Sequence, residues 1–198
     1  FAVDTQRPTA TLLVADASLT LGETSLVTVS FSRPVTGFSN ADLTITGGTL
    51  STLSSSDGGS TWTATFTPTA GSQSTGNSLV LDNTGVTDSA GNTGTGTSSS
   101  NAFAIDTLRP TATVLVADTS LTLGETSLVT ITFSEAVTGF TNADLTVAGG
   151  TLSSVASGDG GITWTATFTP TSGLTSASNV IELDTSGLMD LAGNAGSG

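Results

Sequence analysis

The sequence predicts an all-β chain built as two tandem Greek-key sandwiches, and two observations carry this prediction. The first is an internal repeat. Phe1–Asp4 returns as Phe103–Asp106, and the offset of 102 residues (103 − 1) continues without a gap to Gly198. Of the 96 overlapping pairs (198 − 102), 65 are identical. The second is a series of short segments that alternate apolar and polar residues and are separated by residues typical of turns.

The length of the repeat indicates a whole domain. Solenoid units repeat every ~20–50 residues, whereas a small β-sandwich takes about 100. We therefore expect one domain over residues 1–105 and a second over 106–198, each with its own core. Residues 1–4 match the end of a repeat, so we expect them to be the tail of a preceding repeat's last strand. The counterpart of Asn101–Asp106 would begin at residue 203 (101 + 102), so we expect the second domain to lack its last strand.

Taken in order, the first copy is expected to hold seven strands. A short strand fits Thr9–Ala15, and in Ser25–Ser32 one face carries Val27, Val29 and Phe31 while the other is mostly hydroxylated. Two more short strands fit residues 42–46 and 49–53. Turns rich in Gly, Asp and Asn separate these segments.

The second half of the copy completes the set. In Thr61–Thr67 the aromatic and alanine side chains face inward and the threonines face outward. A strand over residues 79–81 has Val80 at its centre, and this position is Glu182 in the second copy, so it must face solvent. The last strand, Asn101–Asp106, should turn Phe103 inward. No stretch has helical periodicity over ten residues.

Seven short strands in about 100 residues, with turns every 8–12 residues, are typical of an immunoglobulin-like Greek-key sandwich. An antiparallel barrel is the alternative architecture. Pro8 and Pro110 follow the short connections into each copy, and a proline there favours a stiff joint over a Gly/Ser coil. We therefore expect the two sandwiches to stand end to end.

Composition excludes several classes of function. The chain has 16 acidic residues against three arginines, Arg7, Arg33 and Arg109, and a formal net charge of −13. These residues cannot form the basic patch of a nucleic-acid site. His, Cys, Lys and Tyr are absent, which removes the usual bases, nucleophiles and soft-metal ligands, so we expect no enzyme. No apolar run approaches the ~18 residues needed to insert across a membrane.

The aspartates form six pairs at the repeat offset. Turn chemistry explains three of them, since Asp57 precedes two glycines and both Asp16 and Asp82 lie where strands end. The other three pairs begin with Asp4, Asp42 and Asp88, and immunoglobulin topology brings these toward one end of each sandwich.

In that topology the B–C and F–G loops lie at the pole where the linker enters. Several carboxylates would then converge there in the second copy and repel one another, whereas Ca²⁺ binds about 6–8 oxygen ligands and would turn the repulsion into attraction. We expect a Ca²⁺ site at this joint formed by Asp106, Glu135, Asp144, Asp190 and Asn194. The alternative is that these acids are solvated charges that keep a repetitive extracellular rod soluble.

The first copy should hold a weaker or rearranged site at Asp4, Asp42, Asp88 and Asn92. The position of Glu135 is occupied there by Arg33, which would supply the positive charge that an ion supplies in the second copy.

The two tryptophans admit two interpretations. Trp62 and Trp164 could stack against sugar rings, but their register with the neighbouring inward residues places them on the core face.

A set of motifs recurs over both copies. In the second copy these are Phe-Ser-Glu-Ala-Val-Thr-Gly-Phe (133–140), Asn-Ala-Asp-Leu-Thr (142–146), Gly-Gly-Thr-Leu (149–152), Trp-Thr-Ala-Thr-Phe-Thr-Pro (164–170) and Asp-Leu-Ala-Gly-Asn (190–194), with the linker Asp-Thr-x-Arg-Pro-Thr. Together they resemble the bacterial immunoglobulin-like repeats of giant surface adhesins, which are often secreted by type I systems and carry RTX repeats. Arg33, in place of the usual Glu, and Arg7 and Arg109 in the linkers depart from the family pattern.

The resemblance implies a non-catalytic extender at the bacterial cell surface: tandem extracellular repeats, rigidified by Ca²⁺ at their joints, that project a binding tip during attachment and biofilm formation. Its partners would be the neighbouring repeats of the same polypeptide. The competing interpretation is an immunoglobulin-like module that itself binds a glycan or a partner protein, for which Phe38 and Phe140 are the candidate contacts. We also expect head-to-tail self-association, in which Phe1–Asp4 of one molecule completes the second copy of the next.

Overall fold

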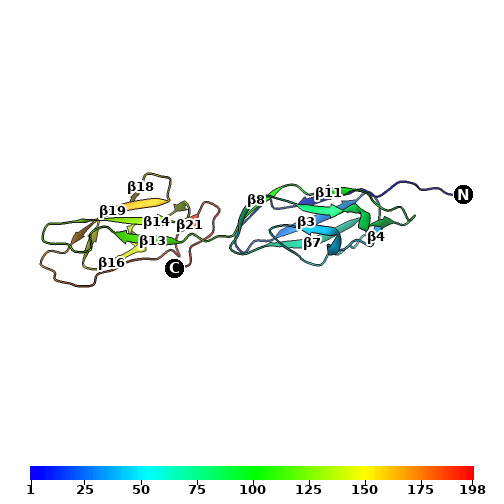
Figure 1. Ribbon diagram of the computed structural model, residues 1–198. Helices are drawn as coiled ribbons and strands as arrows, with labels where there is room; N and C mark the ends of the chain where they lie inside the picture. The colour runs from blue at the N-terminus through cyan, green and yellow to red at the C-terminus, as the bar shows by residue number, and fades with distance from the viewer. The chain divides into compact units, whose positions relative to one another are not determined.

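A computed structural model describes all residues from Phe1 to Gly198 and separates into two compact units, Phe1–Leu108 (unit 1) and Arg109–Gly198 (unit 2) (Figure 1). Short strands and three 3-10 helices make up the regular structure. No helix is both long and apolar enough to cross a membrane. The division falls three residues after the expected boundary, because the hydroxyl of Thr107 still donates to the carbonyl of Thr69 in unit 1, at 2.8 Å.

Unit 1 consists of short strands with two 3-10 helices between them. In chain order these are β1 (Ala10–Val14), β2 (Ser18–Leu19), β3 (Ser25–Phe31), β4 (Val35–Thr36), η1 (Asn40–Asp42), β5 (Leu43–Ile45), β6 (Gly48–Leu50), β7 (Thr61–Pro68), β8 (Gln73–Asn77), β9 (Leu79–Asp82), η2 (Asn83–Gly85), β10 (Thr87–Asp88), β11 (Thr97–Ser99) and β12 (Phe103–Asp106).

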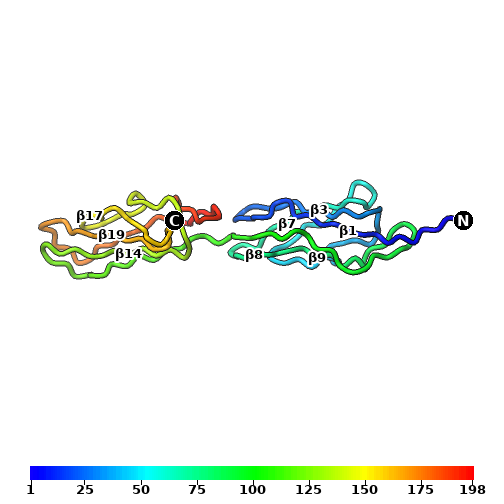
Figure 2. The backbone as a smooth tube through the Cα atoms, turned by 90° about the horizontal axis from the view of Figure 1, so that it is seen from above, coloured from blue at the N-terminus to red at the C-terminus, as the bar shows by residue number.

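These strands form a sandwich. One layer is the antiparallel sheet β1-β3-β7-β6, and the other combines β11-β9-β5 with β2-β12-β8, while β4 pairs with β10 (Figure 2). Inward residues from both layers form one core. Val29 of β3 lies opposite Trp62 of β7, and across the core the rings of Phe66 and Phe103 meet edge to face with centroids 5.1 Å apart. The alternation in β3, β7 and β12 therefore becomes the two faces of the core.

Unit 2 repeats most of this plan. Its elements are β13 (Ala112–Val116), β14 (Ser127–Phe133), β15 (Val137–Thr138), η3 (Asn142–Asp144), β16 (Leu145–Val147), β17 (Gly150–Leu152), β18 (Ala156–Ser157), β19 (Thr163–Pro170), β20 (Ile181–Leu183) and β21 (Met189–Asp190). The sheet β13-β14-β19-β17, to which β18 also pairs, faces the pair β16-β20, and β15 pairs with β21.

The segments of unit 2 that correspond to β2 and β8 form no strand, and the positions that correspond to β11 and β12 would lie beyond Gly198. The core of unit 2 is correspondingly less covered on that side. Leu19, Leu79 and Leu81 are at most 1% exposed in unit 1, whereas their counterparts Leu121, Ile181 and Leu183 are only partly buried.

The predicted fold class is confirmed: the chain is all-β, and each unit is a sandwich of the expected kind. All seven expected strands of the first copy exist. The prediction missed β8 and β11, because Gln73–Asn77 and Thr97–Ser99 are polar and show no alternation. It also missed β2, β4 and β10, which are only two residues long.

Candidate cation site

In unit 2 the pairing of two short strands brings together two acidic side chains. Glu135 lies between β14 and β15, and Asp190 ends β21. Because Val137 of β15 pairs with Asp190, the segment that carries Glu135 runs past the end of β21. Their proximity is therefore a property of the fold of unit 2.

Asp190 is buried and held rigidly by its own loop. Its Oδ1 accepts hydrogen bonds from the N–H groups of Gly193 (2.7 Å) and Asn194 (2.8 Å), and its Oδ2 accepts one from the side-chain amide of Asn194 (2.8 Å). Asp190 and Asn194 are each 3% exposed. The spacing Asp-x-x-Gly-Asn closes this turn, since Gly193 has φ of 101°.

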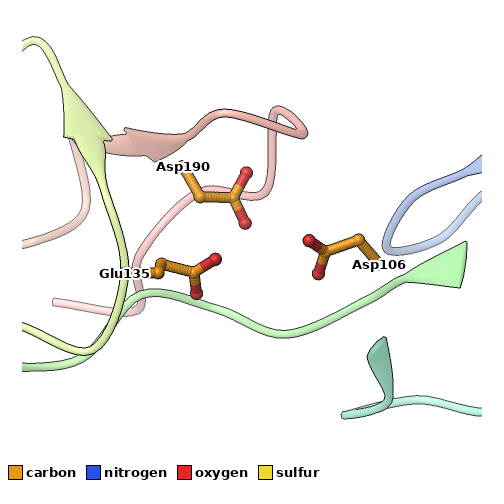
Figure 3. A group of neighbouring side chains, drawn as sticks. All are labelled: Asp106, Glu135 and Asp190. Carbon is orange, nitrogen blue, oxygen red and sulfur yellow. The ribbon is translucent and has the colours of Figure 1, made fainter. Parts of the chain in front are cut away.

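Asp106, which Figure 3 draws together with this pair, is positioned by unit 1. There its Oδ2 accepts a hydrogen bond from the side-chain amide of Gln73 at 2.7 Å and its Oδ1 accepts one from the N–H of Leu108 at 3.2 Å. Carboxylate oxygens such as those of Glu135 and Asp190 are the ligands that a hard divalent cation prefers.

Asp144 is not part of this group. It is the third residue of η3, and its Oδ2 accepts hydrogen bonds from the N–H and the hydroxyl of Thr141 at 2.8 and 3.1 Å. This is a capping box, in which a side chain at each end of the turn satisfies the backbone of the other. Asp42 does the same with Ser39 in η1 of unit 1.

The equivalent residues of the first copy all belong to unit 1, and they include a positively charged side chain, Arg33. Nη1 of Arg33 donates to Oδ2 of Asp4 at 2.8 Å and to Oδ2 of Asp88 at 3.2 Å, and Nη2 donates to the side-chain oxygen of Gln6 at 2.6 Å. The side-chain amide of Asn92 donates to Oδ2 of Asp88 at 3.1 Å. Asp4, Arg33, Asp88 and Asn92 thus meet, as the sequence predicts.

The ionised form of Asp88 is stabilised by its neighbours. Burial raises its pKa, but hydrogen bonds from Asn92, Ala90 and Arg33 outweigh burial and hold the pKa below its usual value. Its side chain is 1% exposed, so the guanidinium of Arg33 neutralises a carboxylate that water does not reach.

The other aspartates occupy turns. Oδ1 of Asp57 accepts from the N–H groups of Ser60 and Thr61, and Oδ1 of Asp16 and of Asp82 each accept from the N–H two residues further on. Their interpretation as turn residues is confirmed. Two further residues support these charges, since Gln6 accepts a hydrogen bond from Arg33 and Gln73 donates one to Asp106. Neither glutamine follows a sequence pattern that would single it out.

Aromatic side chains lie inside both units. Trp62 and Trp164 are partly buried, their indole N–H groups donate to the carbonyls of Gly59 and Gly161 at 3.1 Å, and both pack against the core. Phe38 and Phe140 are 6% and 4% exposed. Sugar-stacking platforms are therefore not formed by these residues.

Two arginines bind the entering chain to the same loops. Nη1 of Arg7 donates to the carbonyl of Thr93, and Nη1 of Arg109 donates to that of Ala195, each at 2.6 Å. In both copies the linker arginine therefore lies beside the segment that follows the Asp-x-x-Gly-Asn turn.

Of the comparisons with known proteins, the match to a family model is the one that supports a conclusion. A family model described as a bacterial Ig-like domain matches residues 4–105 and again residues 106–198. A search of curated proteins finds no match. Among 108 matching chains of solved structures is the Escherichia coli adhesin FdeC, with 16% identity over 86% of this chain and a TM-score of 0.41, a value at which nothing is concluded from the similarity. The chain spans 57% of the length of that structure.

The two family matches adjoin each other and together cover nearly the whole sequence, with the period of the internal repeat. The resemblance to bacterial immunoglobulin-like repeats is therefore confirmed: the chain belongs to the family of bacterial Ig-like domains.

Proposed function

We propose that the chain is a pair of non-catalytic spacer repeats from a large bacterial cell-surface adhesin, and that Ca²⁺ stiffens the joint between the repeats. The observation that carries the proposal is the difference between equivalent positions: Arg33 joins two aspartates in unit 1, whereas unit 2 has Glu135 there. The acids of unit 2 thus gather where unit 1 has a fixed positive charge.

A spacer needs a sealed core and an inert surface, and the aromatic residues favour this over a binding module. Seven of the eight phenylalanines are buried; the exception, Phe1, lies in the N-terminal tail. Both tryptophans donate to backbone carbonyls of their own unit. A glycan-binding or protein-binding module would present such side chains in exposed loops.

The proposed ion is held by Glu135 and Asp190 of unit 2 and by Asp106 of unit 1, and Asn194 fixes Asp190 in place. Ca²⁺ would supply the charge that compensates these carboxylates. The short connection supports stiffness, because Thr107 is bonded into unit 1 and Arg109 into unit 2, with only Leu108 between them.

The sequence resemblance supports the setting of this proposal: an RTX-type adhesin, exported to the extracellular face of the cell and active in attachment and biofilm formation. The neighbouring repeats of the same polypeptide are the proposed partners.

Thermal melting of the full chain tests the calcium proposal. An ion that binds only the folded state stabilises it by mass action, so CaCl2 should raise Tm and a chelator should lower it. Glu135→Gln and Asp190→Asn should abolish the shift. Glu182→Gln removes an exposed acid of unit 2 outside the cluster and should leave the shift intact. Equal shifts in all three variants would show that the ligands are wrongly assigned.

A further inference from the structure

We infer that the guanidinium of Arg33 takes the place of a metal ion between Asp4 and Asp88 in unit 1. The chain would then bind one divalent cation and not two. This inference rests on the proposed calcium site of unit 2 and specifies which repeats of such an array depend on calcium.

The geometry of unit 1 carries the inference. One nitrogen, Nη1 of Arg33, donates to the Oδ2 atoms of both Asp4 and Asp88. Asp4 corresponds to Asp106 and Asp88 to Asp190, the residues that form the proposed calcium site with Glu135. The guanidinium therefore bridges the oxygens that a metal would bind.

The second terminal nitrogen is committed as well. Nη2 donates to the side-chain oxygen of Gln6 at 2.6 Å, whereas Nε is buried without a hydrogen-bond partner. Arg33 is 23% exposed at its side chain, and Asp88 only 1%. A divalent ion entering this site would have to displace a fixed guanidinium and lie beside its charge.

The same loop geometry holds the acids in both units, so the difference lies in one side chain. The N–H of Asn92 donates to Oδ1 of Asp88, as the N–H of Asn194 does to Oδ1 of Asp190, both at 2.8 Å. The N-terminal tail of unit 1 is held by the ion pair of Arg33 with Asp4, which chelators do not affect and salt weakens.

Calcium titration of the decalcified chain by calorimetry tests this inference through reciprocal variants. We expect a stoichiometry of one for the natural chain, two for Arg33→Glu and none for Glu135→Arg. Arg33→Lys is the matched control, because it keeps the charge, and its stoichiometry should remain one. Glu135→Arg should fold, since unit 1 already accommodates an arginine at this position; its Tm should not respond to chelator.

The outcomes separate the inference from the function on which it rests. Two ions bound by the natural chain, or one bound by Arg33→Glu, would overturn the role of Arg33 and leave the calcium proposal standing. No ion bound by the natural chain would overturn the calcium proposal itself.

Discussion

Among single residues, the difference that matters most for the proposed cation site is that the first copy has Arg33 where the second copy has Glu135. The charges of Asp4, Arg33 and Asp88 in unit 1 sum to −1 (−1 + 1 − 1), and the charges at the equivalent positions, Asp106, Glu135 and Asp190, sum to −3. In the proposed site this change of two charges decides whether an ion is needed.

The candidate site could be predicted in part from single residues. Immunoglobulin topology predicts that the loops of Glu135 and Asp190 meet at one pole of the sandwich, and Arg33 stands out because it breaks the repeat. The prediction for Asp144 is wrong for a local reason: Thr141-Asn142-Ala143-Asp144 has the spacing of a capping box, which already explains the carboxylate.

Two aspartates in turns, Asp57 and Asp159, are expected to make the free energy of unfolding decrease at acid pH. Backbone hydrogen bonds from Thr61 and Thr163, together with bonds from neighbouring residues, lower the pKa values of Asp57 and Asp159 to about 2 from an ordinary value of 3.8. Because the folded pKa lies below the unfolded one, their stabilisation is complete above pH ~4 and is lost as the pH falls toward ~2. Urea midpoints measured from pH 5 to 2 should fall through this window.

The double variant Asp57→Asn/Asp159→Asn keeps an acceptor oxygen at each turn and removes the charge. Its urea midpoint should be lower at neutral pH and should change less across the acid window. An unchanged pH profile would mean that other carboxylates govern the acid sensitivity.

At the level of elements, alternation predicted the strands that build the core, and tertiary pairing created those that it missed. β8 is a polar segment, Gln73–Asn77, that pairs with β12. Nothing in the alternation of these polar residues signals a strand, and the segment is extended where its backbone pairs with that of β12.

The tight turns show the opposite case, in which local sequence suffices. The Ser39-to-Asp42 and Thr141-to-Asp144 segments form the same capped 3-10 turn in both units, although the first residue differs. The hydroxyl and carboxylate types are conserved between the copies, and these are the groups that make the cap.

At the scale of the whole molecule, the internal repeat accounts for the division of the chain into two domains of one family. Two bacterial Ig-like domains, each with its own core, succeed each other with one residue between their anchored ends. The sequence predicted this organisation because 65 of 96 positions recur. It could not predict which residues anchor the linker, because Gln73 and Thr69 act through contacts distant in sequence.

The central claim is that the repeats form a spacer stiffened by an ion. Small-angle scattering with and without calcium is the most direct test of this claim. In calcium we expect a maximum dimension on the order of 80–90 Å, the length of two sandwiches end to end with strands rising ~3.3 Å per residue. Chelator, or Glu135→Gln in calcium, should broaden the distance distribution, since the joint loses its clamp. A compact particle with the domains side by side, or a distribution that ignores both calcium and Glu135, would contradict the account.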